Sequence, residues 1–131
     1  MSHAVAVVLE LEDTPENHEA IEAATIALGG TVSQQNTFRY WGGRTGKCRY
    51  ALIFPTATWD VGVDAKEGLI QLLFDPYGTG GGLNDYLGDK NASALKQQIS
   101  VAKVQAAAKK KKGVKRVKRK TLKTNKNYVW R

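Results

Sequence analysis

The strongest candidates for functional residues in this sequence are the lysines and arginines that cluster towards its C-terminal end. Nine lysines and arginines fall within the twelve positions 109–120. Clustered cations bind polyanions because each neutralised phosphate releases condensed counterions, whatever the base sequence. We therefore predict a nucleic-acid or other polyanion site, whose residues are Lys109, Lys110, Lys111, Lys112, Lys115, Arg116, Lys118, Arg119, Lys120 and Lys123.

Two aromatic residues follow this cluster. Tyr128 and Trp130 are two positions apart, so on a strand they would share one face and could stack on bases. The alternative is that both rings face the core while the lysines keep the surface soluble. Exposed rings favour nucleic acid, whereas buried rings leave the nature of the partner open.

The sequence contains few other groups of residues that could form a catalytic or metal-binding site. His3, His18 and Cys48 lack the spacing of a metal site, and a Cys48–His3 nucleophilic pair competes with a buried structural cysteine. The glycine-rich stretch 78–82 is followed by Leu-Asn-Asp instead of the Gly-Lys-Ser/Thr of a phosphate loop. Four aspartates that could share a metal fall mostly at predicted strand ends and turns, where this residue is ordinary: Asp60, Asp64, Asp75 and Asp85. We expect no enzyme activity, no metal and no cofactor.

The charge of the chain is divided unevenly. The net charge is +8, but residues 1–100 hold all twelve acidic residues and seven of the twenty lysines and arginines. Residues 101–131 hold the other thirteen cations. Such a basic block indicates a polyanion or an acidic surface as partner. The alternative function is therefore an interaction or structural subunit, whose basic end docks an acidic protein or the acidic helix (Glu16, Glu19, Glu22) of a neighbouring copy.

The elements that must position these residues follow from hydrophobic period and turn signals. Asp13 or Thr14, followed by Pro15, starts a helix that Gly29-Gly30 ends, with Ile21, Ala24 and Leu28 on its packed side. A second helix is predicted from about 91 to 112, with apolar positions at Leu95, Ile99, Ala102, Val104 and Ala106–Ala108 and a cap at Gly113. Strands are predicted at 3–11, 31–32, 37–41, 48–54, 58–63, 69–74, 114–122 and 127–131, with a hairpin turn at 42–46.

The order β-α-β-β-β-β-α-β-β predicts an α+β fold with a mostly antiparallel sheet and two helices packed on one face. A length of 131 residues fits a single domain, 1–131, with the basic helix end and hairpin at about 103–131. No apolar run is long enough to span a membrane. The N-terminus lacks a basic leader region and one cysteine suits a reducing compartment, so we expect a cytoplasmic protein with no membrane partner.

Four segments carry a resemblance to a known family. They are Met-Ser-His before the first strand, Tyr-Trp-Gly-Gly-Arg-Thr at 40–45, Trp-Asp-Val-Gly at 59–62 and Ile-Ser-Val-Ala-Lys-Val at 99–104. Together these resemble the hypothetical-chloroplast-reading-frame-35 family of algal plastids and cyanobacteria. The resemblance implies a small α+β domain of unknown function without assigned catalytic residues, and a stromal location if plastid-encoded.

The chain departs from that family in two places. Its terminal helix and hairpin are purely basic, whereas relatives mix acids with bases. Residues 72–77 read Leu-Leu-Phe-Asp-Pro-Tyr where relatives are rich in tryptophan. The resemblance therefore implies a divergent branch, of viral or mobile-element origin. On these grounds the predicted function is a non-enzymatic module that contacts nucleic acid through its basic end.

Overall fold

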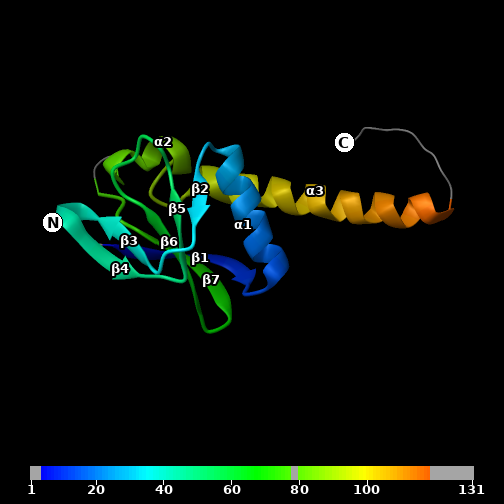
Figure 1. Ribbon diagram of the computed structural model, residues 1–131, viewed down its shortest axis with the longest axis horizontal. Helices are drawn as coiled ribbons and strands as arrows, with labels where there is room; N and C mark the ends of the chain where they lie inside the picture. The colour runs from blue at the N-terminus through cyan, green and yellow to red at the C-terminus, as the bar shows by residue number, and fades with distance from the viewer. Residues whose placement is uncertain (1–3, 78–79, 119–131) are drawn as a thin grey trace.

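The computed structural model describes residues 4–77 and 80–118 and contains a mixed set of strands and helices (Figure 1). None of the helices within these residues is long and apolar enough to cross a membrane. In chain order the elements are β1 (Val5–Glu12), α1 (Pro15–Ala27), β2 (Thr31–Ser33), β3 (Thr37–Tyr40), the 3-10 turn η1 (Trp41–Gly43), β4 (Arg44–Lys47), β5 (Tyr50–Ile53), β6 (Val61–Lys66), β7 (Leu69–Phe74), the 3-10 turn η2 (Gly80–Gly82), α2 (Asn84–Leu87) and α3 (Ser93–Lys118).

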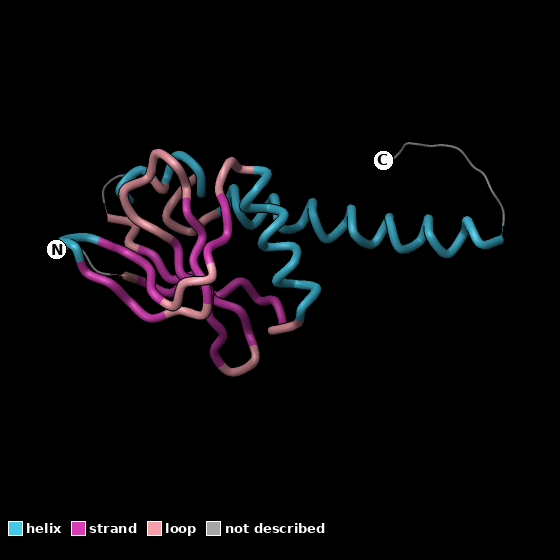
Figure 2. Tube along the Cα trace, in the orientation of Figure 1, coloured by secondary structure: helices cyan, strands magenta, loops and turns pink. Residues whose placement is uncertain are grey.

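Five strands form one antiparallel sheet in the order β1-β7-β6-β5-β2, and β3 and β4 form a separate two-stranded hairpin (Figure 2). The connections from β5 to β6 and from β6 to β7 are short, whereas α1 lies between β1 and β2 and the β3–β4 hairpin lies between β2 and β5. This arrangement confirms the predicted α+β fold with a mostly antiparallel sheet. The helix α2 and the separation of β3–β4 from the main sheet were not predicted.

Helix α1 forms as its start and stop signals predict. The Thr14 side chain accepts a hydrogen bond from the Asn17 backbone N–H at 3.3 Å, and Pro15 occupies the first helical position. Gly29 ends the helix with φ +98°, a conformation that residues with a side chain rarely adopt. Ile21 is fully buried, which confirms the predicted packed side of the helix. The three glutamates predicted on the other side are exposed: Glu16, Glu19 and Glu22.

The main core lies between one face of the sheet and the helices. Alternate residues of β5, β6 and β7 point into this core. Side chains of α1, α2 and the first turns of α3 pack against them on the same face of the sheet. Figure 1 shows α1 lying beside the start of α3 over this face. The largest fully buried side chains are Phe54, Phe74, Ile21, Leu52, Ile70, Leu72, Leu83, Leu87 and Leu95.

The opposite face of the sheet is covered by the β3–β4 hairpin. Phe38 of β3 packs with Cys48 and Ala51 in a second buried cluster, which Ile53 and Leu73 of the sheet also contact. The hairpin partner predicted for residues 37–41 is therefore wrong: β3 pairs with β4, and the segment after it, β5, pairs with β2 and β6. The reason is that Gly42 (φ +75°) and Gly43 (φ +74°) reverse the chain at once, so the return strand begins inside the predicted turn.

Glycine is required where Phe38 meets the sheet. A Cβ atom placed on Gly62 would lie 2.6 Å from a ring carbon of Phe38 and 2.9 Å from the Cβ of Cys48. A Cβ atom on Gly46 would lie 2.5 Å from the same ring. The absence of side chains at these two positions lets the ring sit directly on the backbones of β6 and β4, which closes this layer of the structure.

An ion pair between the exposed Arg39 and the buried Asp60 fixes the hairpin to the residue that precedes β6. The Asp60 carboxylate is fully buried and accepts hydrogen bonds from the Arg39 guanidinium at 2.9 and 2.8 Å and from the Arg39 backbone N–H at 3.0 Å. The Asp60 backbone N–H donates in return to the Arg39 carbonyl at 3.0 Å. Removal of Arg39 would leave the Asp60 carboxylate buried without its charged partner, which is destabilising.

The structure corrects two further boundaries. The predicted strand 58–63 begins only at Val61 and runs to Lys66, because the preceding residues form a loop in which Trp59 packs against Gly81. Helix α3 continues through Gly113 to Lys118, so Gly113 is not its cap and residues 114–118 are not a strand. Residues 119–131, which include the predicted strand 127–131, lie outside the described part of the chain.

The contact between Phe38 and Gly62 yields a first prediction. Gly62→Ala should lower the free energy of unfolding by about 1–3 kcal/mol, the usual cost of overpacking a core, as measured by urea denaturation. In a Phe38→Leu background the same substitution should cost clearly less, because the ring that the new methyl group meets is gone. Equal costs in both backgrounds would show that the ring does not limit the space at Gly62.

Candidate nucleic-acid interface

The first turns of α3 are anchored to the domain. Leu95 is fully buried and Ile99 nearly so, and both belong to the main core. Asp89 accepts hydrogen bonds from the backbone N–H of Ser93, at 3.1 Å, and from its hydroxyl, at 2.6 Å. These hydrogen bonds lower the pKa of Asp89. The start and direction of the helix are therefore fixed by the domain.

The second part of α3 leaves the domain. Every residue from Lys103 to Lys109 is exposed, and Val104 has 69% of its surface accessible. Figure 1 shows the helix extending well beyond α1 and the sheet. Val104 and Ala106–Ala108, which were predicted as apolar positions of this helix, are therefore exposed, because α1 and the sheet end before the helix does. We call residues 103–118 the projecting half of α3.

The projecting half carries charge of one sign only. Its sixteen residues contain eight cations and no acidic residue: Lys103, Lys109, Lys110, Lys111, Lys112, Lys115, Arg116 and Lys118. A helix turns by about 100° per residue, so four consecutive lysines are distributed around its whole circumference. Positive charge in the last turns also complements the negative end of the helix dipole.

The structure brings most of the predicted polyanion-binding residues onto this one helix. Lys109 is an exposed residue of α3. Lys110, Lys111, Lys112, Lys115, Arg116 and Lys118 follow on the same helical backbone, where the sequence had predicted a helix end and a strand. The other predicted residues lie outside the described part of the chain and stay predictions: Arg119, Lys120, Lys123, Tyr128 and Trp130.

Cys48 is placed as a structural residue. Its side chain is buried in the cluster around Phe38, and burial raises the pKa of the thiol. A thiol held protonated is a poor nucleophile. His3, the partner considered for a catalytic pair, lies outside the described residues.

The four candidate metal-binding aspartates have other surroundings. Asp60 is paired with Arg39, one Asp64 oxygen accepts the Ala65 backbone N–H, and one Asp75 oxygen accepts that of Tyr77. Asp85 is exposed in the first turn of α2. Among residues 4–77 and 80–118, no group of three histidine, cysteine, aspartate or glutamate side chains is close enough to hold a metal ion.

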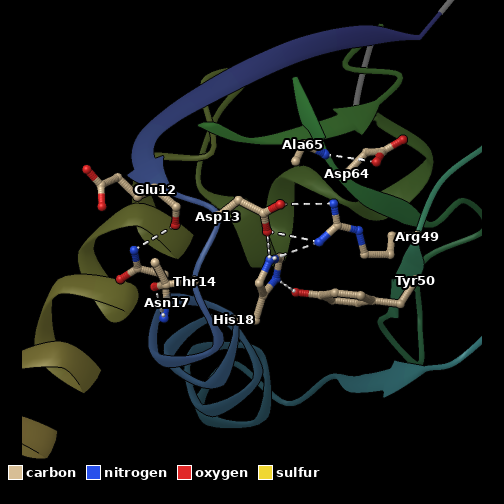
Figure 3. A network of polar contacts seen from close by, with 9 residues as sticks. All are labelled: Glu12, Asp13, Thr14, Asn17, His18, Arg49, Tyr50, Asp64 and Ala65. Carbon is tan, nitrogen blue, oxygen red and sulfur yellow. Dashed lines mark hydrogen bonds and ion pairs between the residues drawn. The ribbon is translucent and has the colours of Figure 1, made fainter. Parts of the chain in front are cut away.

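One polar cluster was not predicted from the sequence. Asp13 follows β1, His18 lies in the first turns of α1, and Arg49 and Tyr50 lie at the start of β5 (Figure 3). The Arg49 guanidinium donates to both Asp13 oxygens, at 2.9 and 3.1 Å. His18 lies 2.6 Å from Asp13 Oδ1 through Nε2 and 2.6 Å from the Tyr50 hydroxyl through Nδ1. All four polar groups therefore have partners within the cluster.

The cluster joins the β1–α1 corner to β5. Hydrogen bonds from Arg49 and then from His18 lower the pKa of Asp13 from its ordinary 3.8 to about 2. Burial is the main cause that raises the pKa of Tyr50 well above its ordinary range. Because Tyr50 stays protonated, its hydroxyl donates to Nδ1 when His18 Nε2–H donates to Asp13. Asp13 and His18 meet Arg49 and Tyr50, which lie 31 or more positions away in the sequence. The cluster could therefore be found only once the position of β5 in the sheet was known.

With this geometry in hand, comparison with known proteins adds no relative. Protein-family models, curated proteins and solved structures give no match to the chain. The resemblance to the hypothetical-chloroplast-reading-frame-35 family therefore stays a prediction.

The low pKa of Asp13 predicts an acid dependence of stability. A carboxylate whose pKa is depressed on folding stabilises the fold above its ordinary pKa, and this stabilisation disappears as the pH falls through the folded value. Asp13→Asn should therefore reduce stability at neutral pH, and the difference from the unsubstituted protein should vanish between about pH 4 and pH 2. Glu19→Gln removes an exposed charge from the same region as a control. A difference that is independent of pH would contradict the ionic role of Asp13.

Because α3 continues through Gly113, the direction of the change in helix content on Gly113→Ala shows whether the helix ends there. Inside an exposed helix, Gly→Ala adds about 1 kcal/mol of helix stability, so Gly113→Ala should strengthen the circular dichroism signal at 222 nm. Gly29→Ala is the matched control: Gly29 ends α1 with φ +98°, so alanine should destabilise there. Loss of helical signal on Gly113→Ala would mean that the helix ends at Gly113.

Proposed function

We propose that the protein is a non-enzymatic nucleic-acid-binding module and that the projecting half of α3 is its contact surface. The observation that carries the proposal is that a helix anchored in the core extends into solvent with eight cations and no acidic residue over sixteen positions. The domain fixes the direction of the helix, and the lysines and arginines supply sequence-independent attraction to phosphates.

The dimensions of the projecting half suit a nucleic-acid duplex. Sixteen helical residues span about 24 Å at 1.5 Å per residue, and a helix with side chains is about 10–12 Å wide. The major groove of B-DNA is about 12 Å wide and admits such a helix, with phosphates along both edges. Lysines on several sides of the helix can then reach both edges of the groove. Because contacts of lysines with phosphates carry no base information, we expect affinity without sequence preference.

Five exposed acidic residues of the domain lie on β1 and α1 and none on α3. Glu10 and Glu12 on β1 and Glu16, Glu19 and Glu22 on or next to α1 are exposed. They would repel a polyanion from this side of the domain and favour contact through the projecting half. The same acids favour a second candidate function, in which the projecting half of one copy docks on the acidic β1–α1 side of another. The single cysteine supports a reducing compartment for either function, which is the cytoplasm or a plastid stroma.

A matched pair of variants tests the proposal. Lys110→Gln combined with Lys112→Gln should weaken binding to a labelled DNA duplex, and the slope of log K against log salt should flatten by about 0.9 for each lost phosphate contact. Lys66→Gln combined with Lys90→Gln removes the same charge from exposed positions of the domain and should change the slope little. Fluorescence anisotropy at several salt concentrations measures both slopes, and an unrelated duplex sequence should give the same values.

Two results would contradict nucleic-acid binding. One is the absence of duplex and RNA binding by the unsubstituted protein at low salt. The other is equal weakening by both variant pairs, which would show that only net charge matters. Self-association that is lost in the Lys110/Lys112 variant, seen by sedimentation velocity, would replace the proposal with the docking function.

A further inference from the structure

A second surface with a different chemistry lies at the tip of the β3–β4 hairpin. Trp41 follows β3 directly, and 44% of its surface is exposed to solvent. The Arg44 guanidinium carbon lies over its ring, 5.9 Å from the ring centroid. This distance is within the range of a cation–π interaction. A large aromatic ring held at the surface beside a cation is the arrangement that stacks on nucleobases.

The hairpin holds this ring on a rigid support. Its base is fixed by the Arg39–Asp60 pair and by the seating of Phe38 on Gly62. Phe38 and Tyr40 stack with their ring centroids 5.7 Å apart. Binding to a rigid surface loses little conformational entropy, so the tip is pre-organised for a ligand.

The charged residues of the β3–β4 hairpin itself are all cations. The chain has no acidic residue between Glu22 and Asp60, and this stretch contains four cations. Arg39 and Arg49 are neutralised by Asp60 and Asp13, respectively. Arg44 and Lys47 of β4 are exposed on the same hairpin as Trp41. The tip therefore combines an accessible ring with the cation of Arg44. Lys47, which pairs with Thr37 at the other end of β4, adds a second cation along the hairpin.

We propose that the β3–β4 hairpin binds single-stranded nucleic acid at its tip, with the Trp41 indole stacked on a base, Arg44 on a flanking phosphate and Lys47 on a phosphate further along the same strand. A paired base hides its faces in the duplex stack, so stacking selects single strands. The site does not depend on the projecting half of α3, which lies at the opposite end of the molecule (Figure 1). One chain thus carries two contacts with different preferences.

The test compares Trp41→Ala with Trp41→Phe on a labelled oligo-dT of about ten nucleotides, which is in the range of single-strand site sizes. Loss of one stacked base costs about 1–3 kcal/mol, so Trp41→Ala should weaken binding by roughly 5- to 150-fold. Trp41→Phe retains a ring and should keep most of the affinity. Duplex binding, measured in parallel, should be the same in both variants. Because Trp41 is exposed, thermal unfolding should change little, which confirms that both variants are folded.

Arg44→Gln with Lys47→Gln should flatten the salt slope for oligo-dT by about 0.7 for each lost phosphate contact, the value for single strands. Unchanged oligo-dT affinity in Trp41→Ala, or no oligo-dT binding by the unsubstituted protein, would overturn the inference. Binding to vesicles of phosphatidylserine and phosphatidylcholine that depends on Trp41, without oligo-dT binding, would overturn it in favour of a membrane. Trp41-dependent oligo-dT binding without any duplex binding would support this site while contradicting the proposed role of α3.

Discussion

The seating of the Phe38 ring on the backbone of Gly62 makes this a three-layered protein. A five-stranded sheet with helices on one face would otherwise leave the centre of its other face in water. Because Gly62 has no side chain, the ring reaches the sheet, Ala51 and Cys48 are buried around it, and the partly buried Leu73 packs against them. The Arg39–Asp60 pair then fixes the same hairpin by charge and by backbone hydrogen bonds. Packing and electrostatics thus constrain β3 at neighbouring positions, which gives the hairpin tip a defined place.

The sequence predicted the elements that depend on local signals. Helix α1 is bounded by Thr14, Pro15 and Gly29, whose effects act within a few residues, and β7 has the bounds that its apolar pattern predicts. The hairpin partner of β3 was wrong because apolar content favoured the longer segment 48–54, whereas the turn geometry of Gly42 and Gly43 decides the pairing. The pairing of β2 with β5 across the intervening hairpin depends on tertiary packing, which no local pattern records.

Some features of the candidate site could likewise be predicted from the sequence, and others could not. The cations of α3 were identified from composition alone, because a run of like charge is visible without any knowledge of the fold. Their arrangement was not, since Gly113 after four lysines has the signature of a helix end. The ring of Trp41 and the cluster of Asp13, His18, Arg49 and Tyr50 could not be found this way. Exposure and contacts between distant residues are properties of the folded chain.

The continuous course of α3 couples the orientation of its cations to the domain. The buried first turns of α3 fix the rotation of the helix about its own axis. The number of residues between Ile99 and Lys109 therefore determines the direction in which the lysines point relative to the hairpin. Inserting one residue there would turn the charged end by about 100° and move it 1.5 Å outward, while the buried residues stayed in place. Inserting seven would nearly restore the phase and lengthen the arm by about 10 Å. The number of residues in this exposed stretch thus determines both the direction and the distance of the charged end, and it can change without loss of the core.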